Sequence, residues 1–455
     1  MNFFKAIFSE KKKDESPVSV PPAIRSQEPA AEIAEVAVPI AEHVLKSAKL
    51  EEKAVQSSAI YLDYASVTPV DSRILDVMHE CSKELYANPS SLYAAGVRTS
   101  KKLDEAREKV ARCLEVQPTE LYFTSGGTES NNLALRGFFS AIISNVYFRP
   151  HIITSTVEHP SVLEVLKDMS RSGICEVTFV PVLESGIIDM KEFKAALKRE
   201  TVLVTIQYAN NEVGTIQPVQ EIAKAIRHFR KGKPEGTSAD EVFEKTLPMF
   251  HTDACQAPSY LSLRVPALGI DLMTLDSSKF YGPRGAGLLY AKKGIKLRPL
   301  MFGGAQEEYV RPGTEPLANI VGFAEALEEC QKNREAESVR IASLRDSLLK
   351  HLLETVPNLK LNGDEKERLP NNINVCMPGM DAEFCVIRLD AQGIAASSVT
   401  SCRSKKEDSS SYVVAALGRA DCAKSSLRLT LGKYTTESEI ERAKPIISQV
   451  LTTML

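Results

Sequence analysis

No run of apolar residues in the sequence is long enough to span a bilayer as a helix. Net charge is also small: the formal value is −3, which gives no general attraction to nucleic acid or to an acidic membrane. The short apolar opening at 1–8 is followed at once by mixed charge, whereas a secretory signal places its positive charge first. We therefore expect no direct nucleic-acid partner and no membrane attachment.

The nine cysteines include no Cys-x-x-Cys pair and lie singly at positions 81, 113, 175, 255, 330, 376, 385, 402 and 422. This spacing indicates neither a zinc-ribbon metal site nor a disulfide framework. An odd number of isolated cysteines in a large chain fits a reducing compartment, so the predicted location is cytoplasmic. Most are expected to be inert buried thiols, among them Cys255, Cys376 and Cys385.

With 455 residues, 43% of them hydrophobic and 25% charged, the chain can bury a large core and should form two or more domains. Residues 1–57 are rich in Pro, Ala, Val, Glu and Lys. We interpret them as a disordered N-terminal extension, either a tether for a partner or a passive tail.

Strand and helix patterns alternate from residue 61 onward. Strands are expected at 121–124, 151–156, 176–180, 202–208, 250–252, 271–275 and 287–291, with helices between them. A polar insertion at 230–248 interrupts the pattern once, and a long amphipathic helix is expected from about 320 to 356. The alternation predicts an α/β fold whose mostly parallel sheet is covered on both faces.

Candidate site residues follow four of these strands: Gly127 with Thr128, then His159, Asn211 and Asp253. Ligands bind at the carboxyl ends of parallel strands. We therefore expect these residues to meet at one edge of the sheet.

A lysine, an acid and a glycine-rich turn together indicate a site for pyridoxal 5'-phosphate (PLP). Lys279 stands between two serines and a glycine-rich turn, and a lysine amine forms a Schiff base when its surroundings favour the uncharged form. Asp253 would pair with the pyridine nitrogen, and the helix entry at 124–130 would supply backbone donors for the phosphate. Taken alone, Lys279 would be interpreted as a surface lysine; the other two parts favour the cofactor.

Five sequence blocks occur in a fixed order: TSGGTESNN (124–132), TVEH (156–159), NNEVG (210–214), DACQ (253–256) and KFYGPRG (279–285). Together they resemble the cysteine desulfurases, PLP enzymes of fold type I related to class V aminotransferases. No Arg-x-Gly-His-His-Cys block is present, so the chain resembles the branch that supplies sulfur for iron–sulfur cluster biogenesis and thio-modification. The resemblance implies a homodimer, a seven-stranded sheet in a large PLP-binding domain (78–319), and a smaller α+β domain (58–77 with 320–455).

The resemblance also implies a role for each matching residue. Lys279 forms the internal aldimine, Asp253 pairs with the protonated ring nitrogen, and His159 stacks on the ring. The other residues implied to contact the ring hydroxyl or the phosphate are Asn211, Gln256, Gly127, Thr128, Ser277 and Ser278.

Two further residues are implied to act on the partner subunit and on the substrate. Thr314, in RPGT, reaches the phosphate of the other subunit, which would make the dimer obligatory. Arg428 clamps the carboxylate of L-cysteine, a bidentate task that suits a guanidinium, with Asn211 beside it.

The sulfur-accepting thiol is implied to be Cys402, which would hold the sulfur of L-cysteine as a persulfide and leave L-alanine. Its segment, SSVTSCRSKK at 397–406, is polar and serine-rich, so we expect an exposed mobile loop. Arg403, Lys405 and Lys406 supply positive charge that favours the thiolate. An acceptor protein, such as an iron–sulfur scaffold or a tRNA-thiolation enzyme, would then take the sulfur.

Three residues depart from the family pattern. Asp276 and Ser278 replace the serine and histidine of Ser-x-His-Lys, and Tyr93 stands where histidine is common. An aspartate facing a phosphate dianion is repulsive by roughly 1 kcal/mol or more, so either Asp276 turns away or PLP binds more weakly. Two alternatives therefore stay open: a selenocysteine lyase or other β-eliminating lyase, and a weakly active scaffold for sulfur transfer.

Overall fold

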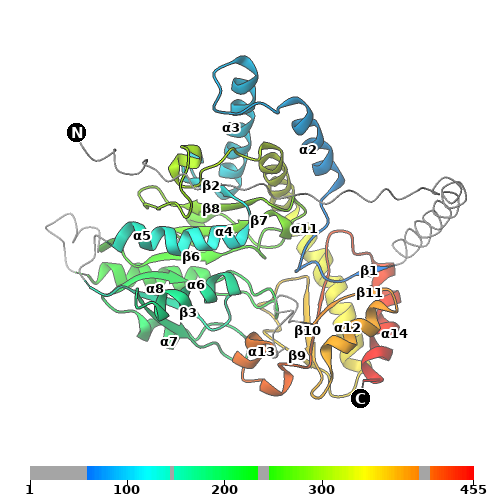
Figure 1. Ribbon diagram of the computed structural model, residues 1–455. Helices are drawn as coiled ribbons and strands as arrows, with labels where there is room; N and C mark the ends of the chain where they lie inside the picture. Colours follow the sequence, from blue (N-terminus) through cyan, green and yellow to red (C-terminus); the bar gives the residue numbers. More distant parts are fainter. Residues whose placement is uncertain (1–58, 144–147, 234–244, 399–409, 455) are drawn as a thin grey trace, which may run out of the picture. The chain divides into compact units, whose positions relative to one another are not determined.

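A seven-stranded sheet forms the centre of the folded chain (Figure 1). The structure is a computed structural model that describes residues 59–143, 148–233, 245–398 and 410–454. The strand order is β2-β8-β7-β6-β5-β3-β4, and within this sheet β8 alone runs antiparallel to its neighbours. The strands are β2 (Leu121–Thr124), β3 (His151–Ser155), β4 (Glu176–Val180), β5 (Thr201–Thr205), β6 (Met249–Asp253), β7 (Leu272–Asp276) and β8 (Gly287–Ala291).

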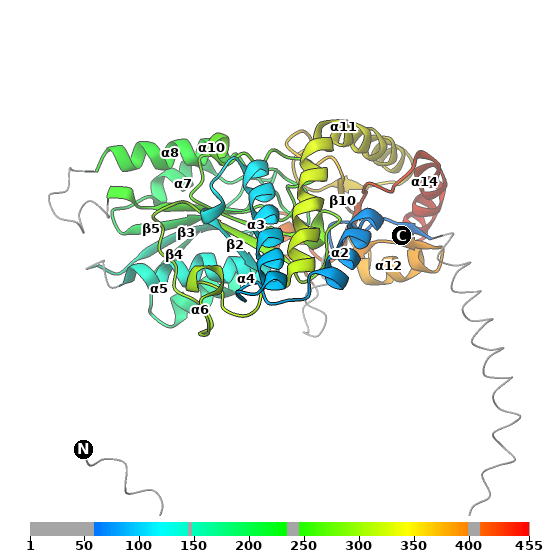
Figure 2. The same cartoon turned by 90° about the horizontal axis from the view of Figure 1, so that it is seen from above.

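Helices cover both faces of this sheet, as the sequence predicted (Figure 2). Side chains alternate along a strand: Ile153 and Val204 join one apolar cluster, whereas Ile152 and Leu203 join another on the opposite face. The first cluster includes α7 (Met190–Ala196), α8 (Val219–Lys231) and α10 (Val265–Leu268). The second includes α5 (Phe138–Ile142), α6 (Pro160–Arg171) and the π-helical turn η2 (Leu133–Gly137) that connects α5 to α4 (Gly127–Asn132).

A four-stranded antiparallel sheet, in the order β12-β13-β10-β9, carries the C-terminal part of the chain. Its strands are β9 (Lys360–Leu361), β10 (Asn372–Cys376), β12 (Ser397–Ser398) and β13 (Ser426–Thr430). Helices α12 (Ala382–Asp390) and α14 (Glu437–Thr452) accompany it, and β1 (Ile60–Tyr61) pairs in parallel with β11 (Ile394–Ala395). The first described residues therefore pack with C-terminal elements, and the domain boundaries at 77/78 and 319/320 stay predictions.

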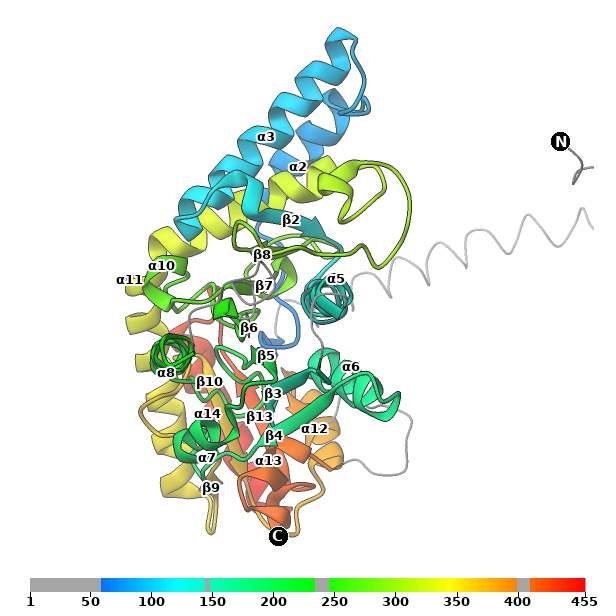
Figure 3. The same ribbon diagram turned by 90° about the vertical axis from the view of Figure 1, so that its left-hand side faces the viewer.

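The helix α11 (Leu317–Thr355) connects these two sheets along the chain. Its first half lies beside α2 (Ser72–Glu84) and α3 (Ala94–Leu114), which Figure 3 shows as one group of helices. Its second half contributes Ile341, Leu348 and Leu352 to the core of the smaller sheet. The long helix expected at about 320–356 is therefore confirmed, and it begins three residues earlier than expected.

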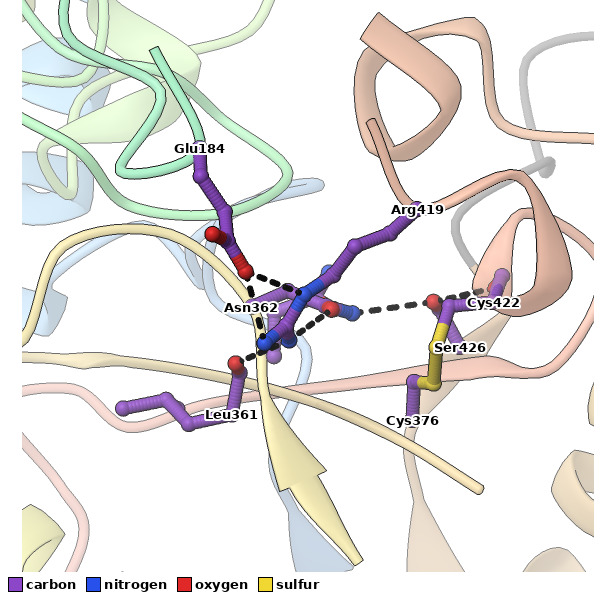
Figure 4. Close-up of a disulfide and its surroundings, with 8 residues drawn as sticks. Glu184, Leu361, Asn362, Cys376, Arg419, Cys422 and Ser426 are labelled. Atoms are coloured by element: carbon purple, nitrogen blue, oxygen red, sulfur yellow. Dashed lines mark hydrogen bonds and ion pairs between the residues drawn. A yellow bond between two sulfur atoms is a disulfide. The ribbon is translucent and has the colours of Figure 1, made fainter. Parts of the chain in front are cut away.

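A disulfide joins Cys376, at the end of β10, to Cys422, in the short helix η7 (Ala420–Cys422) (Figure 4). Both cysteines are fully buried. The Ser426 hydroxyl donates to the carbonyl of Cys422 (2.7 Å) and accepts from Asn362 Nδ2 (3.0 Å). The prediction that Cys376 is a free core thiol is therefore wrong. The two cysteines are 46 residues apart, and the fold brings them together without a spacing motif.

Several sequence predictions fall on residues that the structure does not describe. These are the extension at 1–57, most of the insertion at 230–248, and the loop that contains Cys402. Among the described helices, none has both the length and the apolar character needed to cross a membrane.

Candidate active site

A cavity of about 490 Å³ lies at the carboxyl ends of the central strands. The four strand-end positions singled out in the sequence all contribute to its wall, and so do Lys279 and, from the smaller sheet, Arg428. The predicted residues that line it are Gly127, Thr128, His159, Asn211, Asp253, Gln256, Lys279 and Arg428. The parallel order of β3, β5, β6 and β7 explains this convergence, because their ends share one edge.

Asp253, the last residue of β6, is held in place by two donors. Asn131 Nδ2 donates to its Oδ2 (2.7 Å), and the backbone N–H of Cys255 donates to its Oδ1 (3.0 Å). Asn131 also donates to the hydroxyl of Ser161 (2.8 Å), while its own Oδ1 is buried with no partner among the described atoms. A carboxylate fixed in this way can present its charge to a ligand without rearrangement.

His159 caps the N-terminus of α6. Its Nδ1 accepts from the backbone N–H of Ser161 (3.2 Å) and lies 2.7 Å from the Ser161 hydroxyl oxygen. Burial lowers the pKa of His159, with Asp253 acting in the opposite direction. The ring is thus held in one orientation beside Asp253, with its neutral form favoured.

Lys279 ends a short helical turn, η4 (Ser277–Lys279), that follows β7 directly. Its Nζ donates to the carbonyl oxygen of Ser66. Ser66 belongs to the segment that follows β1, so the amine is anchored across the cavity by a residue far away in the sequence. This placement inside a cavity excludes the interpretation of Lys279 as an ordinary surface lysine.

Arg428, on β13, is almost completely buried. Its guanidinium donates to Asp63 Oδ1 (2.8 Å), to the Ser66 hydroxyl (2.6 Å) and to the carbonyl of Asn211 (3.0 Å). Its Nε has no acceptor among the described residues. A buried guanidinium with an unused N–H beside a cavity can receive an anionic ligand group.

The entrance to α4 combines two glycines with a carboxylate. Gly126 has φ +152°, a backbone angle that L side chains rarely adopt, and a Cβ on Gly127 would lie 2.8 Å from Cys255 Sγ. Asp276 Oδ2 accepts from the N–H of Gly127 (3.0 Å). Its Oδ1 accepts from both the N–H (3.0 Å) and the hydroxyl (2.7 Å) of Ser278. Asp276 therefore faces the helix entrance and does not turn away from it.

Four predicted site residues lie elsewhere. The Ser277 hydroxyl donates to the carbonyls of Pro283 and Ala286, so it closes the turn and does not enter the cavity. The Ser278 hydroxyl is bound to Asp276 and also lies off the cavity wall. Thr314 is exposed and outside the cavity, and Cys402 lies outside the described residues.

Asn131, Ser66 and Tyr412 are among the cavity residues that were not predicted from the sequence. Asn131 lies in the TSGGTESNN block, where its position one helical turn after Gly127 could have indicated a side chain on the same face. Ser66 and Tyr412 come from distant segments, and their sequence carries no signal of this role.

Comparison with known proteins identifies the family. The model of the class V aminotransferases matches residues 60–233 and 238–443. The chain belongs to this family. Cysteine desulfurase IscS of Dictyoglomus turgidum is 36% identical over 392 residues, covering 86% of this chain and 94% of that protein. IscS of Methanosarcina thermophila is 36% identical over 401 residues, covering 88% and 94%.

Solved structures agree with this result. A NifS-like protein superposes with a TM-score of 0.77 at 30% identity, covering 87% of this chain and all of that one. SspA in complex with cysteine gives a TM-score of 0.67 at 29% identity, covering 83% and 100%. The chain is therefore an enzyme of the class V aminotransferase family, within its NifS- and IscS-like cysteine desulfurases, whose members are generally PLP-dependent. The α/β fold predicted from the sequence is confirmed.

Proposed function

We propose that the protein is a PLP-dependent cysteine desulfurase, which converts L-cysteine to L-alanine and holds the released sulfur as a persulfide on Cys402. The observation that carries the proposal is the convergence of Lys279, Asp253, His159 and Arg428 on one cavity. IscS proteins are similar to this chain over most of its length. The sulfur would serve iron–sulfur cluster biogenesis or thio-modification through an acceptor protein.

The residues that line the cavity suit the ring and the aldehyde of PLP. When bound, PLP supplies an aldehyde for covalent attachment of an amine and a ring that accepts electrons from the substrate. Asp253, fixed by Asn131 and Cys255, would hold the proton on the ring nitrogen. Lys279 would provide the amine, and His159 would lie against the ring. The Oδ1 of Asn131, at this end of the cavity, is a hydrogen-bond acceptor that no described group uses.

Arg428 would orient the substrate. Its free Nε and its position on β13 suit the carboxylate of an amino acid, and the bond from Arg428 to the Asn211 carbonyl fixes the guanidinium plane. SspA, a structural neighbour, was solved with cysteine, which supports L-cysteine as the substrate here. The Ser66 carbonyl would accept a hydrogen bond from an incoming amine once Lys279 leaves it.

Described residues on both sides of the segment that contains Cys402 lie at or near the cavity. Ser398 pairs with Leu427 beside Arg428, and four further residues span at most about 14 Å. On the other side Tyr412 lines the cavity and donates its hydroxyl to the Glu158 carbonyl (2.6 Å). The Cys402 thiolate would form a bond to the substrate sulfur as the sulfur–Cβ bond breaks. The electron pair left at Cβ would take up a proton to give alanine.

We further propose a homodimer in the cytoplasm in which Thr314 completes the partner's phosphate site. Thr314 is exposed and does not reach its own cavity. Large apolar side chains are exposed nearby in the sequence and on the turn before α3: Phe302 and Leu92 are each more than 90% exposed, and Tyr309 is 69% exposed. Burial of such side chains against a second copy would offset their contact with water.

The test is the attachment of PLP to Lys279. With added PLP, the purified protein should show visible absorbance and, after borohydride reduction, a pyridoxyl group on Lys279 together with sulfide release from L-cysteine. Lys279→Ala should lose the absorbance and the turnover. Lys292→Ala, a lysine outside the cavity that pairs with Asp271, should keep both. A pyridoxyl group on another lysine of an active enzyme would refute the assignment.

A further inference from the structure

The carboxylate of Asp276 lies at the entrance to α4, where the backbone N–H groups would hold the phosphate of the cofactor. One of its oxygens takes the first free N–H of α4, from Gly127 (3.0 Å), and the other takes both donors of Ser278. Gly126 and Gly127 leave no side chain between this carboxylate and the backbone: a Cβ on either residue would lie 3.4 Å from Asp276. The N–H of Gly127, at this end of the cavity, is therefore already bound to an anion.

The helix behind this position makes the placement of a carboxylate favourable. Leu133 and Phe138, at the joins between α4, η2 and α5, have right-handed helical backbone angles, so the helix is continuous from Gly127 to Ile142. Its aligned peptide dipoles favour an anion at the first turn. Asp276, at the end of β7, already places an anion at this first turn. A phosphate bound there would need the same N–H groups.

The charge of Asp276 has no ion-pair partner in the part of the chain that the structure describes. None of the salt bridges found among the described residues involves it. Arg311 is bound to Glu129, in the first turn of α4 (3.0 Å), and Lys279 donates to the Ser66 carbonyl. A phosphate dianion that entered here would meet an uncompensated carboxylate at a short distance.

We propose that Asp276 is a specificity-determining residue that competes with the cofactor phosphate for the N–H of Gly127, while Ser278, off the cavity wall, holds its other oxygen. This proposal rests on the proposed function, because it concerns the same cavity. Its consequence is that the ring contacts and Lys279 supply most of the binding energy. PLP is then exchangeable, and pyridoxal, which lacks the phosphate, binds almost as well as PLP.

The experiment compares PLP with pyridoxal on the full-length protein. Dissociation constants for both are measured by equilibrium dialysis and by the visible absorbance of the bound form, in wild type, Asp276→Ser and Asp276→Asn. Serine removes the charge and adds a donor, whereas asparagine removes the charge and keeps the size. Asp189→Ser is the matched control, because Asp189 caps α7 through the N–H groups of Lys191 (2.9 Å) and Glu192 (3.2 Å), outside the cavity.

Asp276→Ser should bind PLP at least tenfold more tightly than wild type, a gain of about 1.4 kcal/mol. Its affinity for pyridoxal should change less than threefold, so that the preference for PLP over pyridoxal rises about tenfold. Asp276→Asn should fall between wild type and Asp276→Ser. Asp189→Ser should leave both affinities within threefold.

Two results would overturn the proposal. One is an unchanged or weaker affinity for PLP in both Asp276 variants, and the other is an equal gain for PLP and pyridoxal. If the wild type binds PLP on Lys279 and the variants bind no tighter, this proposal fails while the proposed function stands. Failure of wild type and all variants to bind either compound would reject both.

Discussion

Asp253→Asn separates the role of the carboxylate in chemistry from its role in the fold. Asn131 Nδ2 donates to Asp253 Oδ2. In Asp253→Asn this position holds either the amide oxygen or the NH₂ group. Because Asn131 Oδ1 is unpartnered, rotation of the Asn131 amide would restore a hydrogen bond, and Ser161 would then donate to it. Two charge-assisted hydrogen bonds become neutral ones, so we expect a loss of roughly 1–3 kcal/mol in the free energy of unfolding.

The loss of catalysis should be much larger. A unit charge pair at about 4 Å is worth about 4 kcal/mol at an effective dielectric constant near 20, and the variant no longer stabilises a protonated ring nitrogen. This corresponds to a decrease in turnover of about a thousandfold. The assay is alanine formation from L-cysteine at saturating PLP, with urea unfolding of the same cofactor-free samples.

Asp271→Asn is the control for this variant. Asp271 is a buried aspartate at the opposite end of the sheet, where it accepts from Arg230 (2.5 Å) and from the N–H of Phe250 (3.0 Å). The Asp271→Asn variant should have a lower free energy of unfolding, and its turnover should be unchanged under conditions in which it is folded. Near-normal alanine formation by Asp253→Asn would refute the reasoning, and so would a loss of stability above that of Asp271→Asn.

Burial raises the pKa of Glu158 to about 8 from 4.5, so stability from this group is present at acidic pH and lost as pH rises toward 8. Glu158→Gln should therefore flatten the fall in unfolding free energy between about pH 5 and 8, and an unchanged slope would contradict the cause. Replacement of both Cys376 and Cys422 by alanine should lower the free energy of unfolding by up to about 4 kcal/mol, because the disulfide closes a loop between residues 46 apart. This loss should exceed that of Cys385→Ala, which removes a buried free thiol. Equal losses in the two variants would show that packing of the thiols, and not the crosslink, stabilises this region.

Much of the fold was predictable because its signals are local. The buried strands β3, β5 and β7 each contain a short apolar stretch of two or three residues. His159, shortly after β3, and Asp253, at the end of β6, line the cavity as expected. The helix expected after the strand at 121–124 begins at Gly127, with Gly126 as its N-cap, so the glycine-rich entry is itself the start of the helix. Sequence patterns locate helix ends poorly where glycine is needed for close packing.

The remaining features depend on contacts between distant segments. The sequence left open the direction in which the Asp276 side chain points. One of the groups that donate to it is the N–H of Gly127, which follows β2 and is far from Asp276 in the sequence. Ser277 looked like a phosphate ligand, yet carbonyls of the following turn take its hydroxyl. The pairing of Cys376 with Cys422 and the role of Ser66 likewise follow only from the arrangement of the smaller sheet.

The destination of the substrate sulfur tests the central claim most directly. The PLP-loaded protein is incubated with L-cysteine and no acceptor, and peptides are then mapped by mass spectrometry while small products are quantified. We expect one added sulfur atom on the peptide containing Cys402 and an equal amount of alanine. Cys402→Ser should still bind PLP and should give neither product. Pyruvate in place of alanine, or a persulfide on Cys255 with Cys402 unmodified, would contradict it.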